Sequence, residues 1–233
     1  MIRFCAFLVL IATALTEPLS AQMNEQSAPL APGLAPSAQA APTHEAGALL
    51  VYADDENAVT VTSPDGTTSA GFIGAEIPEG STVTTGRSSA ELQLVPNGSA
   101  IRLAPNTKFR VDTLVGNPGT VTNSFTLLGG KIRMVATKLA DVAEGYVVST
   151  PTAICGIRGT DFARRYDPAS KEDWLCVLEG VVSFHSPDGN RAVSVRGGTF
   201  VELDEGFVAK PVPPVWVKNN FKDIQFVKAA LPR

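Results

Sequence analysis

The sequence has little of the side-chain chemistry from which catalytic and metal sites are built. Its 233 residues include two histidines and three cysteines. His44 lies in a stretch rich in alanine and proline, and His185 stands alone before a turn, where we expect a solvated imidazole rather than a general base. The sequence contains no His-x-His or Cys-x-x-Cys pair and no glycine-rich phosphate loop. We therefore expect a protein that is not an enzyme, with no catalytic residues, no metal and no cofactor.

Positive charge is also scarce. The chain has 19 Lys and Arg against 23 Asp and Glu, a formal net charge of -4. Proteins that bind nucleic acid neutralise many phosphates with basic residues, so we expect no nucleic-acid partner. The densest charged run is Asp54-Asp55-Glu56. Consecutive carboxylates are typical of a solvated turn or sheet edge, and a calcium site is the minor alternative.

Long apolar runs are absent outside the N-terminus. Arg3 supplies a positive charge, Phe4–Leu15 is almost entirely apolar, and small residues surround Ala21. The run is shorter than the roughly 20 residues that cross a bilayer, which argues against the alternative of an uncleaved anchor. We expect a signal peptide over residues 1–21, cleaved after Ala21, and a mature chain in the periplasm or secreted, soluble and without a transmembrane helix.

The next segment cannot form a hydrophobic core. Residues 22–45 are mostly Ala, Pro, Ser and Gln, with four Ala-Pro pairs. Such pairs favour an extended backbone without internal hydrogen bonds. We predict a disordered or semi-rigid linker over residues 22–45.

From Ala46 onward, short runs of Val, Ile, Leu and Thr alternate with turn residues. Ser-Pro-Asp-Gly occurs twice, at residues 63–66 and 186–189, and Pro-Asn-Gly-Ser occupies 96–99. Each turn lies between alternating segments, and Asp-Gly or Asn-Gly closes tight hairpins. The pattern predicts three hairpins in an all-β domain over residues 46–210, folded as a sandwich or roll.

The last segment, residues 211–233, differs from the β domain. It opens with a proline-rich turn, after which Val217, Phe221 and Ile224 recur at near-helical spacing within Val215–Leu231. This spacing predicts a short C-terminal amphipathic helix. We expect the helix to dock on the β domain rather than form a free partner-binding tail.

Two cysteines, Cys155 and Cys176, remain after the expected cleavage. In an oxidising compartment they could form a disulfide worth roughly 3 kcal/mol. Alternatively, both are small buried hydrophobic residues without a bridge. The sequence leaves the two interpretations open.

One segment resembles a family signature. Ser149-Thr150-Pro151 is followed by Gly156-Ile157-Arg158-Gly159-Thr160-Asp161-Phe162. This order is similar to the FecR family, in which a strand ending in Thr-Pro precedes a small-residue turn, Val or Ile, Arg-Gly-Thr, an acidic or polar residue and Phe. Flanking segments resemble the family in the same order, namely 80–86, 90–103, 128–132 and 177–182.

The resemblance covers Ala46–Glu205, most of the expected mature chain. It implies an exported, all-β, jelly-roll-like sandwich that acts by binding and not by chemistry. FecR regulators also carry an N-terminal cytoplasmic segment that contacts a sigma factor, followed by one transmembrane helix. We expect only the exported part here, so the resemblance does not imply that this chain alone transmits a signal across the inner membrane.

The signature has a structural and a functional interpretation. The structural residues are expected to be Thr150, Pro151, Gly156, Gly159 and Phe162. The guanidinium of Arg158 is expected to fasten the turn through internal partners, because a charge among glycines and apolar residues usually needs them. In the alternative, Arg158, Thr160 and Asp161 line a surface that binds a partner or an acidic ligand.

Two functions remain after these exclusions. The favoured one is a periplasmic or envelope module that binds a protein partner or senses a signal. The alternative is a module that binds carbohydrate or cell wall such as peptidoglycan, which would need exposed aromatic side chains. Trp174 and Trp216 are expected to flank the core without clustering, so the first function is preferred.

Overall fold

The computed structural model describes residues 46–115, 122–139, 145–203 and 206–227. All of them belong to one compact unit, Ala41–Arg233. The predicted signal peptide and linker lie outside the described residues. The longest described helix, α1 (Pro214–Asn220), has seven residues, and none of the described helices could cross a bilayer.

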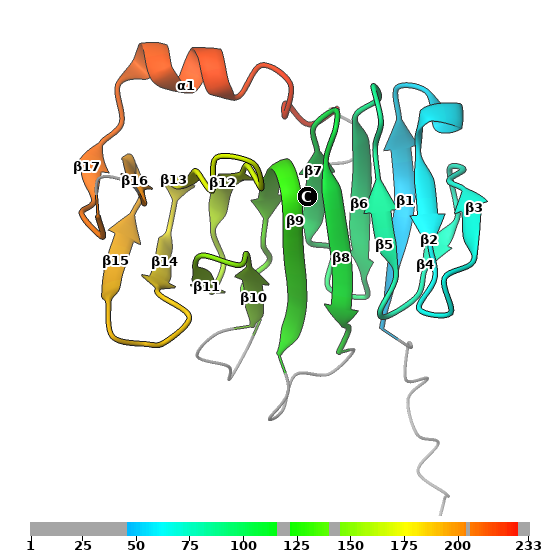
Figure 1. Cartoon of the computed structure of the whole chain (residues 1–233), viewed down its shortest axis with the longest axis horizontal. Helices are drawn as coiled ribbons and strands as arrows, with labels where there is room; N and C mark the ends of the chain where they lie inside the picture. The colour runs from blue at the N-terminus through cyan, green and yellow to red at the C-terminus, as the bar shows by residue number, and fades with distance from the viewer. Residues whose placement is uncertain (1–45, 116–121, 140–144, 204–205, 228–233) are drawn as a thin grey trace, which may run out of the picture. The chain divides into compact units, whose positions relative to one another are not determined.

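Two β-sheets form the described chain (Figure 1). Sheet A contains, in spatial order, β4 (Glu76–Ile77), β1 (Gly47–Ala53), β6 (Ala90–Val95), β7 (Ala100–Leu103), the second half of β9 (Asn123–Val135), β12 (Asp161–Tyr166), β13 (Asp173–Glu179), β16 (Thr199–Glu202) and β17 (Lys210–Pro211). Sheet B contains β3 (Thr68–Ala70), β2 (Thr60–Thr62), β5 (Thr82–Thr84), β8 (Lys108–Thr113), the first half of β9, β10 (Tyr146–Ser149), β11 (Ile154–Ile157), β14 (Val181–His185) and β15 (Ala192–Arg196). A short 3-10 helix, η1 (Glu56–Ala58), lies between β1 and β2.

Strand β9 is shared by the two sheets. Its residues 124–129 pair with β8 in sheet B, and residues 130–135 pair with β12 in sheet A. The pairing of β9 with β10 is parallel, whereas every other pairing in the described residues is antiparallel. The shared strand is the middle strand of both sheets and passes from one layer into the other.

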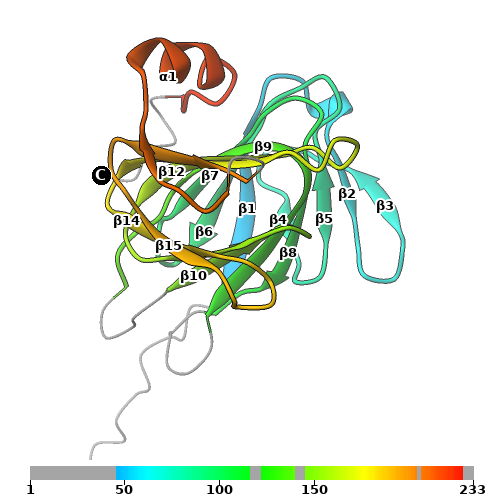
Figure 2. The ribbon, with the colours of Figure 1, turned by 60° about the vertical axis from the view of Figure 1, so that its left-hand side comes forward.

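The core lies between the two layers, which the rotated view of Figure 2 separates. Side chains alternate along the strands, so that in β9 Phe125, Leu127, Ile132 and Met134 are buried. Phe109 of β8 stacks on Phe125 with ring centroids 5.5 Å apart. The alternation seen in the sequence therefore results from one face of each sheet packing on the other sheet.

The predicted all-β sandwich with a short C-terminal helix is confirmed. The three predicted hairpins are present as the antiparallel pairs β2–β3, β6–β7 and β14–β15. The jelly-roll order of the strands stays a prediction.

The acidic run Asp54-Asp55-Glu56 forms a turn with local partners. Asp54 accepts hydrogen bonds from the hydroxyl of Tyr52 and the backbone of Ser89, and Asp55 caps η1 through the backbone N–H of Asn57. These bonds account for the fold of the turn.

The C-terminal helix is shorter than predicted. It ends at Asn220, because two consecutive asparagines favour turns over a helix interior, instead of continuing toward Leu231. Phe221 and Ile224 follow the helix and are buried on the outer face of sheet A, where they pack with Ala163 and Cys176. The segment therefore docks on the domain, as expected, and α1 lies outside the sheet A layer (Figure 2).

Polar contacts continue this docking as far as Val227. The Lys131 ammonium donates to the backbone carbonyl of Asn220 (2.8 Å), and the backbone N–H of Val227 donates to the buried carboxylate of Glu91 (2.8 Å). Residues 214–227, hereafter the C-terminal strap, thus contact the outer face of sheet A from β13 to β6.

The two cysteines do not form the disulfide that the sequence left open. Both are free and fully buried. Cys155 lies in β11 of sheet B and faces the core, whereas Cys176 lies in β13 of sheet A and faces outward, beneath the C-terminal strap. They are on different faces of different sheets, so the interpretation as buried hydrophobic residues is correct.

Burial raises the pKa of both thiols to about 12. We therefore predict that neither Cys155 nor Cys176 reacts with an aromatic disulfide reagent at pH 8 in the folded mature protein, and that both react in denaturant. The pKa of each thiol is higher in the folded protein than in the unfolded chain, so burying the neutral thiols is compatible with full stability below about pH 9. The free energy of unfolding falls as the pH rises toward 12, because the unfolded chain can then ionise its thiols. Labelling of either thiol in the native protein would contradict the described burial.

Candidate functional site

A charged side chain lies at the centre of the sandwich. In β12, alternate residues face the core, and this places Phe162, Arg164 and Tyr166 inside. Arg164 is 0% exposed and is the largest fully buried side chain of the described residues. A buried charge is tolerated only when it is paired and hydrogen-bonded.

All five N–H groups of the Arg164 guanidinium have acceptors within reach. Nε and Nη2 bond the Asp173 carboxylate of β13 at 3.1 and 2.7 Å. Nη1 bonds the carbonyl of Val148 (2.7 Å) and the sulfur of Cys155 (3.1 Å), and Nη2 also reaches the carbonyl of Ala153 (2.9 Å). Burial by itself lowers the pKa of Arg164, but its neighbours Cys155 and Asp173 raise it on balance, so the guanidinium stays charged.

Thr150 of the signature completes this network. Its hydroxyl accepts a hydrogen bond from Arg164 (2.8 Å) and donates one to Asp173 (2.5 Å). The hydroxyl of Thr152 donates to the same carboxylate oxygen (2.8 Å). Arg164 and Asp173 belong to sheet A, whereas Val148 and Cys155 belong to sheet B, so the network joins the two layers.

Sequence reasoning missed this network. The signal was present: Arg164 stands in a β segment where the residues two before and two after it are aromatic, which places it on the core face. The sequence interpretation assigned the role of internal clamp to Arg158 instead.

The structural role predicted for Arg158 is wrong. Its side chain is exposed and makes no hydrogen bond or ion pair with another described residue. Arg158 falls in the turn between β11 and β12, beyond the last buried residue of β11, so its side chain points away from the core.

The other two predicted binding residues lie elsewhere. Thr160 is buried, and Asp161 forms a bidentate ion pair with Arg133 at 2.9 and 2.7 Å on the outer face of sheet A. The three residues Arg158, Thr160 and Asp161 therefore do not line a common surface. Phe162 is in the core, as expected of a structural residue.

Two glycines allow the turns at this end of the sandwich to pack closely. Gly159 has a φ of +60°, and a Cβ there would lie 2.8 Å from the Cβ of Lys138. Gly180 has a φ of +88°, and a Cβ there would lie 2.6 Å from Thr160. The structural role predicted for Gly159 is explained by this close approach.

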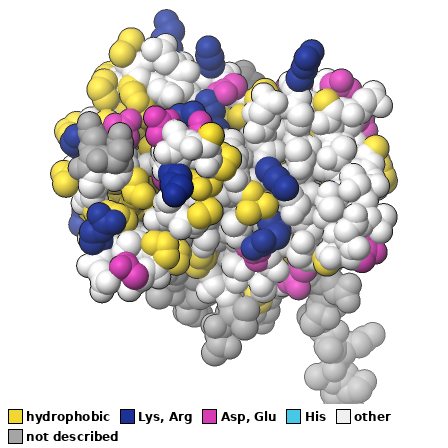
Figure 3. Space-filling model, viewed as in Figure 1, with side chains coloured by type: hydrophobic (Ala, Val, Ile, Leu, Met, Phe, Trp, Pro, Cys, Tyr) yellow, Lys and Arg dark blue, Asp and Glu magenta, His cyan; other side chains and the backbone are white. Residues whose placement is uncertain are grey.

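A shallow groove opens beside these turns on the outer face of sheet B. Its volume is about 440 Å³. It is lined by Lys138, Gly156, Arg158, Gly159, Gly180, Val181, Ser183 and Ser194, and is hereafter the signature groove. Figure 3 shows basic, acidic and hydrophobic side chains interspersed on the side of the molecule where β14 and β15 lie.

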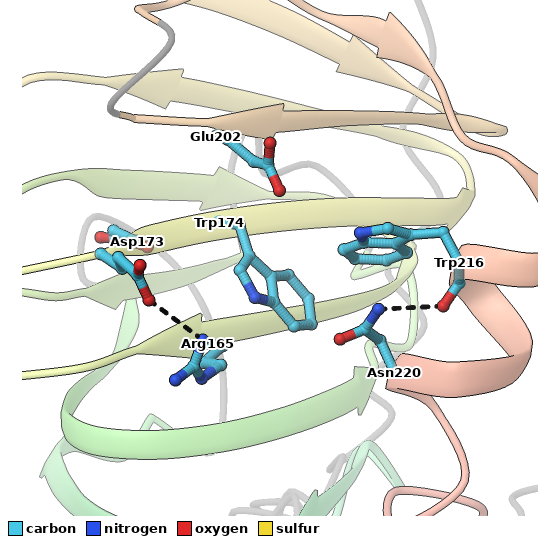
Figure 4. Close-up of a pocket in the computed structure, with 7 residues that line it drawn as sticks. Arg165, Asp173, Trp174, Glu202, Trp216 and Asn220 are labelled. Atoms are coloured by element: carbon cyan, nitrogen blue, oxygen red, sulfur yellow. Dashed lines mark hydrogen bonds and ion pairs between the residues drawn. The ribbon is translucent and has the colours of Figure 1, made fainter.

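The expectation that the two tryptophans do not cluster is also wrong. Docking of α1 brings Trp216 onto Trp174 of β13, with ring centroids 4.8 Å apart in an edge-to-face arrangement. A pocket of about 260 Å³ lies beside them (Figure 4), and its other lining residues are Arg165, Glu172, Asp173, Glu202 and Asn220. Trp174 is only 6% exposed, so it has little ring surface on which a sugar could stack.

We predict that Arg164→Met lowers the free energy of unfolding by about 3–5 kcal/mol, because it leaves the buried Asp173 carboxylate without its cation. The matched control is Arg165→Met on the same strand, whose ion pairs with Asp167 and Glu172 are partly exposed and are worth no more than about 1 kcal/mol. Urea unfolding followed by tryptophan fluorescence measures both. Equal effects of the two substitutions would contradict the importance of the buried network.

Comparison with known proteins gives one family match. The family model described as FecR protein matches residues 81–183, which lie within the range that the sequence resemblance covered. No curated protein matches the chain.

Two solved structures are similar to it, both of a candidate anti-sigma factor from Parabacteroides distasonis ATCC 8503. The first has 14% sequence identity and a TM-score of 0.49, and the match covers 60% of this chain and 64% of that one. The second has 15% identity and a TM-score of 0.41, with 50% and 52% covered. This chain thus spans less than two thirds of the length of either structure. Residues 81–183 of this chain therefore match the FecR family model.

Proposed function

We propose that this chain is an exported regulatory protein whose FecR domain binds a protein of the bacterial envelope through the signature groove. The observation that carries the proposal is the solvent exposure of the Arg158 side chain. The signature buries Thr150 and Phe162, yet it presents Arg158 to solvent in a groove, without a partner in the described chain. A structural role accounts for the buried residues, whereas binding accounts for the exposed one.

Binding, rather than chemistry, fits the groups present. The thiols of Cys155 and Cys176 are buried with a pKa of about 12, so neither supplies a thiolate nucleophile. The signature groove is lined by two cations, three glycines, a valine and two serines. None of these lining residues is a carboxylate or imidazole that could serve as a base for a serine.

We also propose that the chain reaches the periplasm by the signal peptide that the sequence predicts. The support is the arrangement of Arg3, the apolar run Phe4–Leu15 and Ala21. Expressed in a Gram-negative host, the protein is expected in the periplasmic fraction with Gln22 as its first residue. Intact-mass measurement and N-terminal sequencing check this, and a cytoplasmic protein that still begins at Met1 would exclude the proposed compartment.

The binding role is tested by cross-linking in cells. A photo-reactive amino acid replaces Ser194 in the signature groove, and a control protein carries it at Ser69 of β3, the opposite edge strand of sheet B. We expect the Ser194 position, but not the Ser69 position, to capture a defined envelope protein. Arg158→Glu is expected to reduce this capture at least fivefold.

The matched control for charge is Arg87→Glu, which changes another exposed arginine in the loop between β5 and β6. Circular dichroism establishes that both variants are folded. Capture that is equal at Ser194 and Ser69, or unaffected by Arg158→Glu, would exclude the groove as the binding surface. Capture of peptidoglycan fragments instead of protein would favour a cell-wall binding module.

A further inference from the structure

We propose that the signature groove binds an acidic, extended segment of the partner protein, laid across strands β11, β14 and β15. The proposal rests on the proposed function, since it names the chemistry of the segment that the groove would accept.

The register of three strands forms the floor of the groove. Gly156 of β11 pairs with Ser183 of β14, and Ser183 pairs with Ser194 of β15. Residues in register stand side by side on the same face of a sheet, so these small side chains form one row across the strands. The floor of the groove therefore runs perpendicular to the strands.

The rows on both sides of this floor carry larger side chains, except for Ala192 on β15. The neighbouring row on one side contains Val181 paired with Arg196, with Arg158 beyond the end of β11. The row on the other side contains Ile154, His185 and Ala192. A second hollow, lined by Ser183, Ala192, Val193 and Ser194, continues the floor to β15, the last strand of sheet B among the described residues.

The charge of the groove has one sign. Lys138 and Arg158 line it, Arg196 stands in the wall, and none of its described lining residues is acidic. Lys138 and Arg158 are exposed and have no ion pair with another described residue. Carboxylates of a ligand would supply the missing counter-charges, and Arg158 can hold one with two hydrogen bonds.

The shape and the remaining lining groups favour a peptide over a polysaccharide. Val181 is 42% exposed and offers an apolar contact for a side chain, whereas none of the described residues that line the groove has an aromatic ring on which a sugar could stack. Three strands about 4.8 Å apart give a floor about 10 Å long. An extended segment of about four to five residues, at roughly 3.3 Å per residue, reaches from β15 across the floor toward Arg158.

A peptide library tests the proposal, with the mature chain purified from the periplasmic fraction. Random ten-residue peptides displayed on phage are selected for binding, and we expect enrichment of sequences with two or more Asp or Glu and a large apolar residue. A fluorescent copy of the most enriched peptide is then titrated by anisotropy. Raising NaCl from 50 to 300 mM is expected to weaken its binding about tenfold, because the contacts lie at an exposed surface.

Variants then locate the binding. Lys138→Glu with Arg158→Glu is expected to weaken binding of the enriched peptide at least tenfold, and Lys138→Gln with Arg158→Gln by a smaller factor. Arg87→Glu, the matched charge reversal outside the groove, is expected to change it less than twofold. Thermal unfolding of each variant checks that it is folded.

Each other outcome overturns the proposal. In the selection, these outcomes are no enrichment or enrichment of neutral or basic peptides. In the titration, they are acidic peptides that bind the double-Glu variant as tightly as the native protein, or a polyuronate that binds more tightly than the peptide and displaces it. Failure here is separable from failure of the proposed function. If the protein cross-linked at Ser194 is held through a segment that is not acidic, the proposed function stands and the proposed acidic ligand is wrong.

Discussion

The ion pair between Arg164 and Asp173 is the interaction on which the arrangement of this domain depends. Both side chains are fully buried, and a buried charge without partners would cost more than the packing around it could offset. The bonds of the guanidinium reach the backbone of β10 and of the turn before β11 on the sheet B side, and a carboxylate on β13 in sheet A. The network therefore joins the two layers where the turn between β10 and β11 meets the start of β13.

This network explains why the signature has two kinds of residue. Thr150 enters the network directly, and Phe162 packs in the core two residues before Arg164. Once these residues are anchored, the turn between β11 and β12 has a fixed path, and Gly159 allows its close contact with Lys138. Arg158 consequently lines the groove next to a strand whose residues Cys155, Gly156 and Ile157 are buried. A rigid scaffold beneath an exposed side chain is what a binding surface requires.

The two outer faces of the sandwich differ in what covers them. The C-terminal strap lies on sheet A, where Phe221 and Ile224 are buried and Val227 bonds Glu91. On sheet B, the row of small side chains Gly156, Ser183 and Ser194 forms the floor of an open groove. Part of the outer face of sheet A is thus covered within the chain, whereas the sheet B face presents Lys138 and Arg158 without an ion pair to another described residue.

The sequence by itself determined the fold class, the three hairpins and the FecR signature, because alternation and Asp-Gly or Asn-Gly turns are local properties that need no distant contact. It also placed Phe221 and Ile224 on the face that docks. Tertiary structure alone decided the partners of the charged residues. Alternation with Phe162 and Tyr166 is enough to place Arg164 on the core face. Only the packing of sheet B on sheet A supplies its partners Asp173, Val148 and Cys155. Arg158, six residues earlier, follows the end of β11 and is exposed. The same packing separated Cys155 from Cys176 and brought Trp216 onto Trp174, since such contacts depend on which strands become neighbours.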